Sequence, residues 1–180
     1  MPNRFVEVRE AFERQSPEPF QITPTLWLYA DQYVENLRYR NALPLLLQHG
    51  RRYKARPYIY PVHASLGDRC YDKAYEFAMQ DDNLLYCEGF LCYKETERVL
   101  AHGWCMTRDR RIVDPTLYAH QDATGLTYYG FPLRKDYVTE WNKQHGYLGL
   151  LDGHKDGLQV GIHHAPYEYW LEPVEWGNDE

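Results

Sequence analysis

The sequence predicts an α+β fold in which an antiparallel sheet packs against helices. Three apolar stretches, 84–93, 98–106 and 110–114, follow one another with too few residues between them for a helix. Connections this short join antiparallel neighbours, so the three stretches form a meander. The flanking stretches 70–79 and 135–145 carry apolar residues at helical spacing. Helices packed on an antiparallel sheet make α+β architecture.

The chain of 180 residues fits a single domain, 1–180, long enough to bury about two-thirds of its unfolded surface. We expect an N-terminal helical and extended scaffold over 1–62, a core that carries the candidate site over 63–135, and a C-terminal helix and tail over 136–180.

The N-terminal scaffold begins with a short amphipathic helix over 3–15, ended by the prolines that follow. A long helix begins near Thr23, is interrupted at Pro44 and ends at Gly50. The stretch 52–62 is extended, and its prolines favour a sheet edge over a central strand.

The next helix is capped at Ser65 or Asp68 and runs to about Met79. A further strand covers 126–132, whose Tyr-Tyr-Gly-Phe-Pro motif we place at the rim of a cleft. The helix over 135–145 ends at the following glycine.

Composition excludes several classes of protein. A net charge of -6 disfavours a nucleic-acid partner, because phosphate binding needs clustered Lys and Arg. The basic cluster over 51–56 is interpreted as a solvated strand edge, with a site for an acidic partner as the alternative. No apolar run approaches the length of a membrane span, and 4 cysteines without an apolar N-terminal stretch predict reduced thiols in the cytoplasm.

No metal or cofactor is predicted. The stretch 152–163 is superficially like a calcium loop but has His163 where a bidentate glutamate is required. His163 and His164 are adjacent and point apart in a strand, and Cys87 and Cys92 face opposite sides of theirs. The 17 Tyr and 5 Trp fill a small core, or line a cleft as the alternative.

Cys70, His102 and Asp114 are the candidate site residues. Cys70 lies in the first turn of its helix, where unpaired N–H groups and the helix dipole favour an anion. A hairpin loop over 107–109 brings His102 directly opposite Asp114 on one face, with Cβ atoms about 4.5–5.5 Å apart. A two-residue loop would move Asp114 to the other face.

Cys at a helix start, His102-Gly103-Trp104 in a strand and Val113-Asp114-Pro115-Thr116 at a strand end resemble the core of the transglutaminase-like superfamily, relatives of the papain-like cysteine enzymes. The resemblance covers about 67–116. It implies a papain-like or transglutaminase-like core with the nucleophile at a helix N-terminus, and a Cys70–His102–Asp114 catalytic triad that attacks an acyl carbon.

Two hypotheses follow. The first is a thiol enzyme that hydrolyses an amide or transfers its acyl group to an amine, acting on a peptide, a protein or a small amide. Backbone N–H groups of the helix start would hold the oxyanion, with His63 or Ser65 as side-chain candidates. The second is a non-catalytic protein-binding module on the same scaffold. The sequence leaves the choice between hydrolysis and transfer, and the oligomeric state, open.

Overall fold

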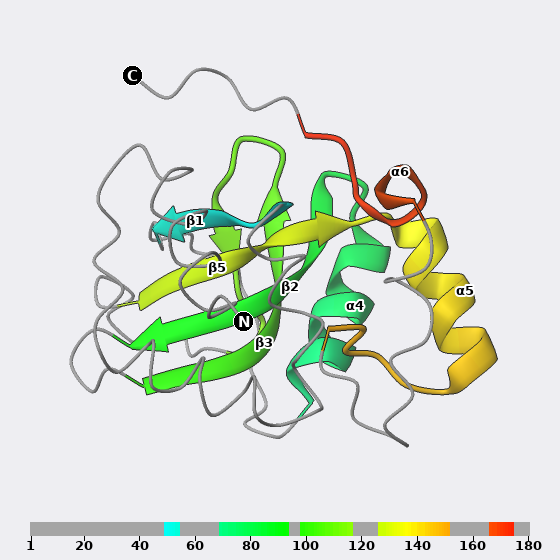
Figure 1. Ribbon diagram of the computed structural model, residues 1–180, viewed down its shortest axis with the longest axis horizontal. Coiled ribbons are helices and arrows are strands. Elements are labelled where there is room, and N and C mark those ends of the chain that lie inside the picture. The colour runs from blue at the N-terminus through cyan, green and yellow to red at the C-terminus, as the bar shows by residue number, and fades with distance from the viewer. Residues whose placement is uncertain (1–48, 55–68, 94–97, 117–125, 152–165, 175–180) are drawn as a thin grey trace, which may run out of the picture.

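The computed structural model describes residues 49–54, 69–93, 98–116, 126–151 and 166–174 (Figure 1). They form β1 (Arg51–Lys54), α4 (Cys70–Gln80), β2 (Leu84–Tyr93), β3 (Arg98–Thr107), β4 (Ile112–Val113), β5 (Leu126–Leu133), α5 (Lys135–His145) and α6 (Tyr167–Trp170). The predicted helices before residue 48, the possible helix caps Ser65 and Asp68, His63 and the stretch 152–164 lie outside the described residues.

The five strands form one antiparallel sheet in the order β1-β5-β2-β3-β4. The predicted meander is present as β2–β3–β4. The predicted extended stretch 52–62 is described only to residue 54, and that part lies in β1 at one edge of the sheet. Figure 1 shows α4 and α5 beside this sheet. The architecture is therefore α+β, with an antiparallel sheet packed against helices. No helix in the described parts of the chain is long and apolar enough to cross a membrane.

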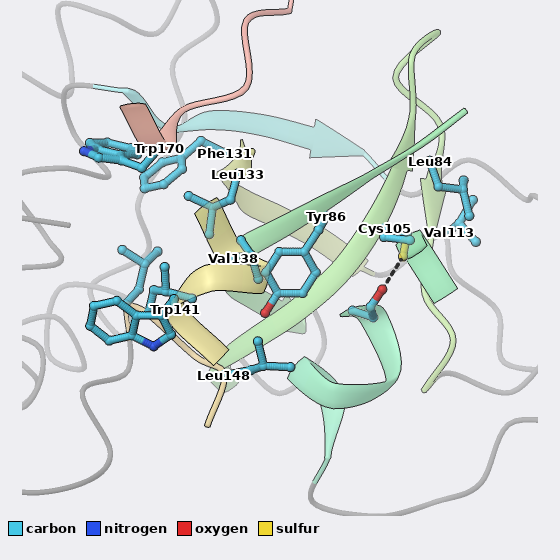
Figure 2. Close-up of a cluster of buried hydrophobic side chains, with 14 residues drawn as sticks. Leu84, Tyr86, Cys105, Val113, Phe131, Leu133, Val138, Trp141, Leu148 and Trp170 are labelled. Carbon is cyan, nitrogen blue, oxygen red and sulfur yellow. Dashed lines mark hydrogen bonds between the residues drawn. The ribbon is translucent and has the colours of Figure 1, made fainter. Parts of the chain in front are cut away.

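Buried side chains cover both faces of the sheet, because successive strand residues point to opposite sides. On β2, Leu84 and Tyr86 belong to the cluster that α4 and α5 complete, which Figure 2 shows. Leu85 and Cys87 belong to the cluster on the other face. The second cluster also contains Tyr53, Leu91, Trp104, Met106, Ile112, Leu126 and Tyr128. Each face thus has its own apolar core.

α4 begins at Cys70, and its N-cap is Arg69, whose side chain makes no capping hydrogen bond. The prediction of Ser65 or Asp68 as the N-cap was wrong. Ala74 and Ala78 are fully buried, and their small side chains let the helix lie close to β3. The Cys105 thiol donates a hydrogen bond to the Ala74 carbonyl at 3.1 Å, drawn as the dashed line in Figure 2.

The β3–β4 hairpin has a three-residue loop, as predicted, but the loop spans 108–110 rather than 107–109. Thr107 N–H donates to the Arg111 carbonyl at 2.9 Å, and Arg110 N–H donates to the Thr107 carbonyl at 2.9 Å. Arg110 takes the left-handed conformation that such a loop requires, with φ 66°.

The one-residue displacement changes the register by two positions. Cys105 lies opposite Val113, so one further step along both arms places Trp104, and not His102, opposite Asp114. The prediction that His102 and Asp114 are directly opposed was therefore wrong. A shift of two keeps Asp114 on the same face as His102, because the side-chain period of a strand is two.

Candidate active site

The shortest hydrogen bond of the site joins His102 of β3 to Asp114, which follows β4. His102 Nε2 lies 2.6 Å from Asp114 Oδ2, on the diagonal of the hairpin. The exposed fractions of the two side chains are 9% and 4%. A hydrogen bond this short between buried groups is of the charge-assisted kind.

The Cys70 thiol is the second partner of the imidazole. Cys70 is half-buried, and its side chain interacts electrostatically with His102, raising the pKa of the imidazole. Nε2 is bound to Asp114, so Nδ1 is the ring nitrogen that remains for another partner. The structure therefore brings together all three residues that the sequence singled out, in the order thiol, imidazole, carboxylate.

A close approach between α4 and β3 sets the place of Cys70. A Cβ atom at Gly103 would lie 2.7 Å from Tyr71 Cδ1 and 3.0 Å from Tyr71 Cα. Only a residue without a side chain lets the first turn of the helix come this near to the strand. The neighbours of this contact are Cys70 on the helix and His102 on the strand, so the contact fixes their separation.

Electrostatics favour a charged pair. Burial by itself lowers the pKa of His102, but the charge of Asp114, the hydrogen bond that Asp114 accepts and the Cys70 side chain outweigh burial and raise that pKa to about 10. Burial raises the pKa of Asp114, whereas the charge and hydrogen bond of His102 and the bonds from Thr116 bring it below its ordinary value. At neutral pH the pair is imidazolium and carboxylate.

Asp114 accepts four hydrogen bonds. Oδ1 accepts from the Thr116 N–H at 2.9 Å and from the Thr116 hydroxyl at 2.7 Å. Oδ2 accepts from Tyr128 Oη at 2.9 Å in addition to His102 Nε2. Sequence reasoning placed the stretch that contains Tyr128 at the rim of a cleft and did not identify this role. The available signal was the excess of tyrosine, which does not single out one residue.

Two aromatic rings lie beside the imidazole. The His102 ring centroid is 6.5 Å from that of Trp104, with the planes nearly parallel at 12°, and 6.2 Å from that of Tyr128. Gly89 and Gly130 face each other across β2 and β5. A Cβ at Gly130 would lie 2.5 Å from Trp104 Cη2, so this glycine makes room for the indole.

The remaining described thiols lie in different surroundings. Cys87 and Cys105 are fully buried, and burial raises the pKa of each well above its ordinary value. Cys105 faces α4, away from His102. Among the thiols that the structure describes, only Cys70 is a partner that shifts the pKa of an imidazole, whereas Cys87 and Cys105 donate to backbone carbonyls.

The arrangement can supply a nucleophile, a proton acceptor and donor, and an orienting carboxylate. The described ranges of the chain contain no group of three His, Cys, Asp or Glu side chains suited to a metal ion. No protein-family model, curated protein or solved structure matches this chain.

Proposed function

We propose that the protein is a cysteine-dependent acyl-transfer enzyme acting on an amide or peptide bond. Cys70 is the nucleophile, His102 the base and later the acid, and Asp114 holds the imidazole. In this proposal the core is similar to that of the transglutaminase-like and papain-like enzymes. The observation that supports it is the buried 2.6 Å contact between His102 and Asp114, together with the interaction of the Cys70 side chain with the same imidazole.

The first half-reaction forms a thioester. The Cys70 sulfur attacks the carbonyl carbon, a C–S bond forms, and the C–N bond of the amide breaks. The imidazolium of His102 gives its Nδ1 proton to the departing amine. Asp114 keeps Nε2 protonated and stabilises the positive ring, as the carboxylate of a catalytic triad does.

The second half-reaction cleaves the thioester and regenerates the free enzyme. Water or a second amine gives a proton to His102 and attacks the thioester carbon, and the C–S bond breaks to restore the Cys70 thiolate. Water yields hydrolysis and an amine yields transfer. Both outcomes use the same three residues, so the acceptor depends on what the surrounding surface admits.

The negative oxygen that develops in each step needs hydrogen-bond donors. Cys70 is the first residue of α4, where the N–H lies ahead of the helix's own i−4 hydrogen bonds, and the Arg69 side chain makes no capping hydrogen bond. This N–H is next to the nucleophilic sulfur. We assign oxyanion stabilisation to the N–H of Cys70.

Intact mass measurement tests the proposal. The protein is incubated with peptide, isopeptide and small amide or ester substrates and quenched in acid, and a mass increase equal to the acyl group is mapped to a residue. We expect the adduct on Cys70 in wild type and none in Cys70→Ala. Cys105→Ala serves as the matched control, because its sulfur lies on the opposite face of β3, and it should retain the adduct.

If no substrate of the panel gives an adduct on Cys70, and Cys70→Ala leaves the biological effect of the protein unchanged, the proposed enzymatic function is rejected. Those two results would favour the protein-binding module instead.

A further inference from the structure

Tyr128 and His102 share one oxygen of Asp114. Tyr128 Oη donates to Oδ2 at 2.9 Å, and His102 Nε2 lies 2.6 Å from the same atom. Tyr128 is almost fully buried, with 1% of its surface exposed. It belongs to β5, which is separated from β3 by β2. A hydroxyl from two strands away therefore contacts the atom that holds the imidazole.

Two donors on one carboxylate oxygen compete for its electron density. When Tyr128 donates, Oδ2 carries less negative charge towards His102, and the imidazolium proton is held less strongly. The two bonds on Oδ1 come from Thr116, which is only two residues away, and they fix the rotamer of the carboxylate. Tyr128 is thus the donor placed to act on the imidazole through Asp114.

We propose that Tyr128 is a positioning residue that sets how strongly Asp114 holds the His102 imidazole. Its consequence for chemistry rests on the proposed function, since a proton held too strongly at His102 is not passed to a leaving amine. The Tyr128 hydroxyl donates to Asp114. It acts on the reaction through the carboxylate.

The ring of Tyr128 also packs in the core, and the effect of this packing must be separated from the effect of the hydrogen bond of its hydroxyl. The ring centroids of Tyr128 and Trp104 are 5.3 Å apart, and both residues belong to the core on the face away from α4. Tyr128→Phe keeps the ring and removes only the hydroxyl. Tyr75→Phe is a matched control, because it removes a hydroxyl that bonds Thr139 at 3.1 Å, away from Asp114.

The proton NMR chemical shift of His102 Nε2–H reports the strength of its hydrogen bond to Asp114 Oδ2. It is measured in the folded protein at neutral pH, without substrate. In Tyr128→Phe this resonance should move downfield, because Oδ2 becomes a stronger acceptor and the remaining bond shortens. Replacing Tyr128 by 3-fluorotyrosine, whose hydroxyl is the better donor, should move it upfield. Tyr75→Phe should leave it in place.

Opposite shifts in the two Tyr128 variants support the proposal. An unmoved resonance in folded Tyr128→Phe, or shifts of the same sign in both variants, would overturn it and leave the tyrosine as a packing residue. If Tyr128→Phe does not fold, the 3-fluorotyrosine protein alone tests the proposal: an upfield shift supports it and an unmoved or downfield resonance overturns it. These readouts are independent of the Cys70 acyl adduct, so failure of the proposed function and failure of the role of Tyr128 give different results.

Discussion

Tyr71 of α4 lies against Gly103 of β3 so closely that a Cβ at Gly103 would be 3.0 Å from the Tyr71 Cα atom. Both residues directly neighbour the candidate site, in sequence and in space. A helix start and a strand can be held this near only where one of them lacks a side chain. The distance between the thiol of Cys70 and the imidazole of His102 therefore depends on this glycine.

Gly103→Ala should separate Cys70 from His102 while leaving the sheet in place. The added methyl group overpacks the contact, which typically costs about 1–3 kcal/mol of unfolding free energy. We expect turnover, and the rate at which Cys70 reacts with iodoacetamide, to fall on the order of tenfold to a hundredfold, since small displacements of reacting groups have effects of this size.

Gly146→Ala is the control for that variant. Gly146 ends α5 with φ 70°, and a Cβ there would meet nothing within 4 Å. It should lose about 1 kcal/mol because of the left-handed conformation alone. Its Cys70 should react at the wild-type rate. Equal rates in both glycine variants and wild type would show that the helix contact does not position the thiol.

Cys70→Ala should abolish turnover at little cost to stability. Cys70 is half-buried at the first position of α4 and belongs to neither apolar core. Truncating it should change the free energy of unfolding by less than about 1 kcal/mol. Thermal unfolding followed by circular dichroism measures the change, and Cys105→Ala, from the core, should lose more. A large drop in the melting temperature of Cys70→Ala would mark Cys70 as a packing residue.

Strong local signals made several elements predictable. β2 and α5 begin and end at the residues that the sequence indicated, because Asp81 to Asn83 stop the preceding helix and Gly146 stops α5. At the hairpin the loop length was right, and its position was wrong by one residue, since Arg110 takes the left-handed conformation expected of Asp109. His102 and Asp114 still lie on the same face of the sheet, because strand side chains alternate between faces and the register changed by two residues.

Long-range contacts account for what the sequence could not reveal. Tyr128 meets Asp114 only because the sheet order places β5 two strands from β3, and no local pattern specifies that order. The approach of Tyr71 to Gly103 is likewise a contact between a helix and a strand that are far apart in sequence. Arg69 as N-cap was missed because it lacks the side-chain acceptor by which caps are recognised.

The stability of the protein should fall as the pH rises from neutral to about 10. The pKa of His102 is 6.5 in the unfolded chain and is raised to about 10 in the folded protein. The stabilisation from its charge is complete below the unfolded value and is lost as the pH rises through the folded one. Across this window the unfolding free energy should fall by up to about 1.4 kcal/mol per pH unit from this group.

Asp114→Asn isolates that contribution. Without the carboxylate, burial dominates and lowers the pKa of His102, so the slope above neutral pH should disappear. Asp82→Asn, at a fully exposed position, should keep the slope of wild type. Urea unfolding of the three proteins at several pH values measures it. In acid, the lowered pKa of Asp114 gives wild type a stabilisation that is lost as the pH falls through the folded value.

Mild alkylation should single out Cys70 among the thiols. Its side chain interacts with the His102 imidazole, which is protonated at neutral pH, and a neighbouring cation favours reaction of a cysteine with an alkylating agent. Cys87 and Cys105 are fully buried, and burial raises the pKa of both. Iodoacetamide near pH 6, followed by peptide mapping, should therefore label Cys70 first. His102→Ala should slow the labelling of Cys70 and leave the other thiols unaffected, because only Cys70 loses its cation. Faster labelling of Cys87 or Cys105, or an unchanged Cys70 rate in His102→Ala, would contradict the pairing of thiol and imidazole on which the proposed chemistry depends.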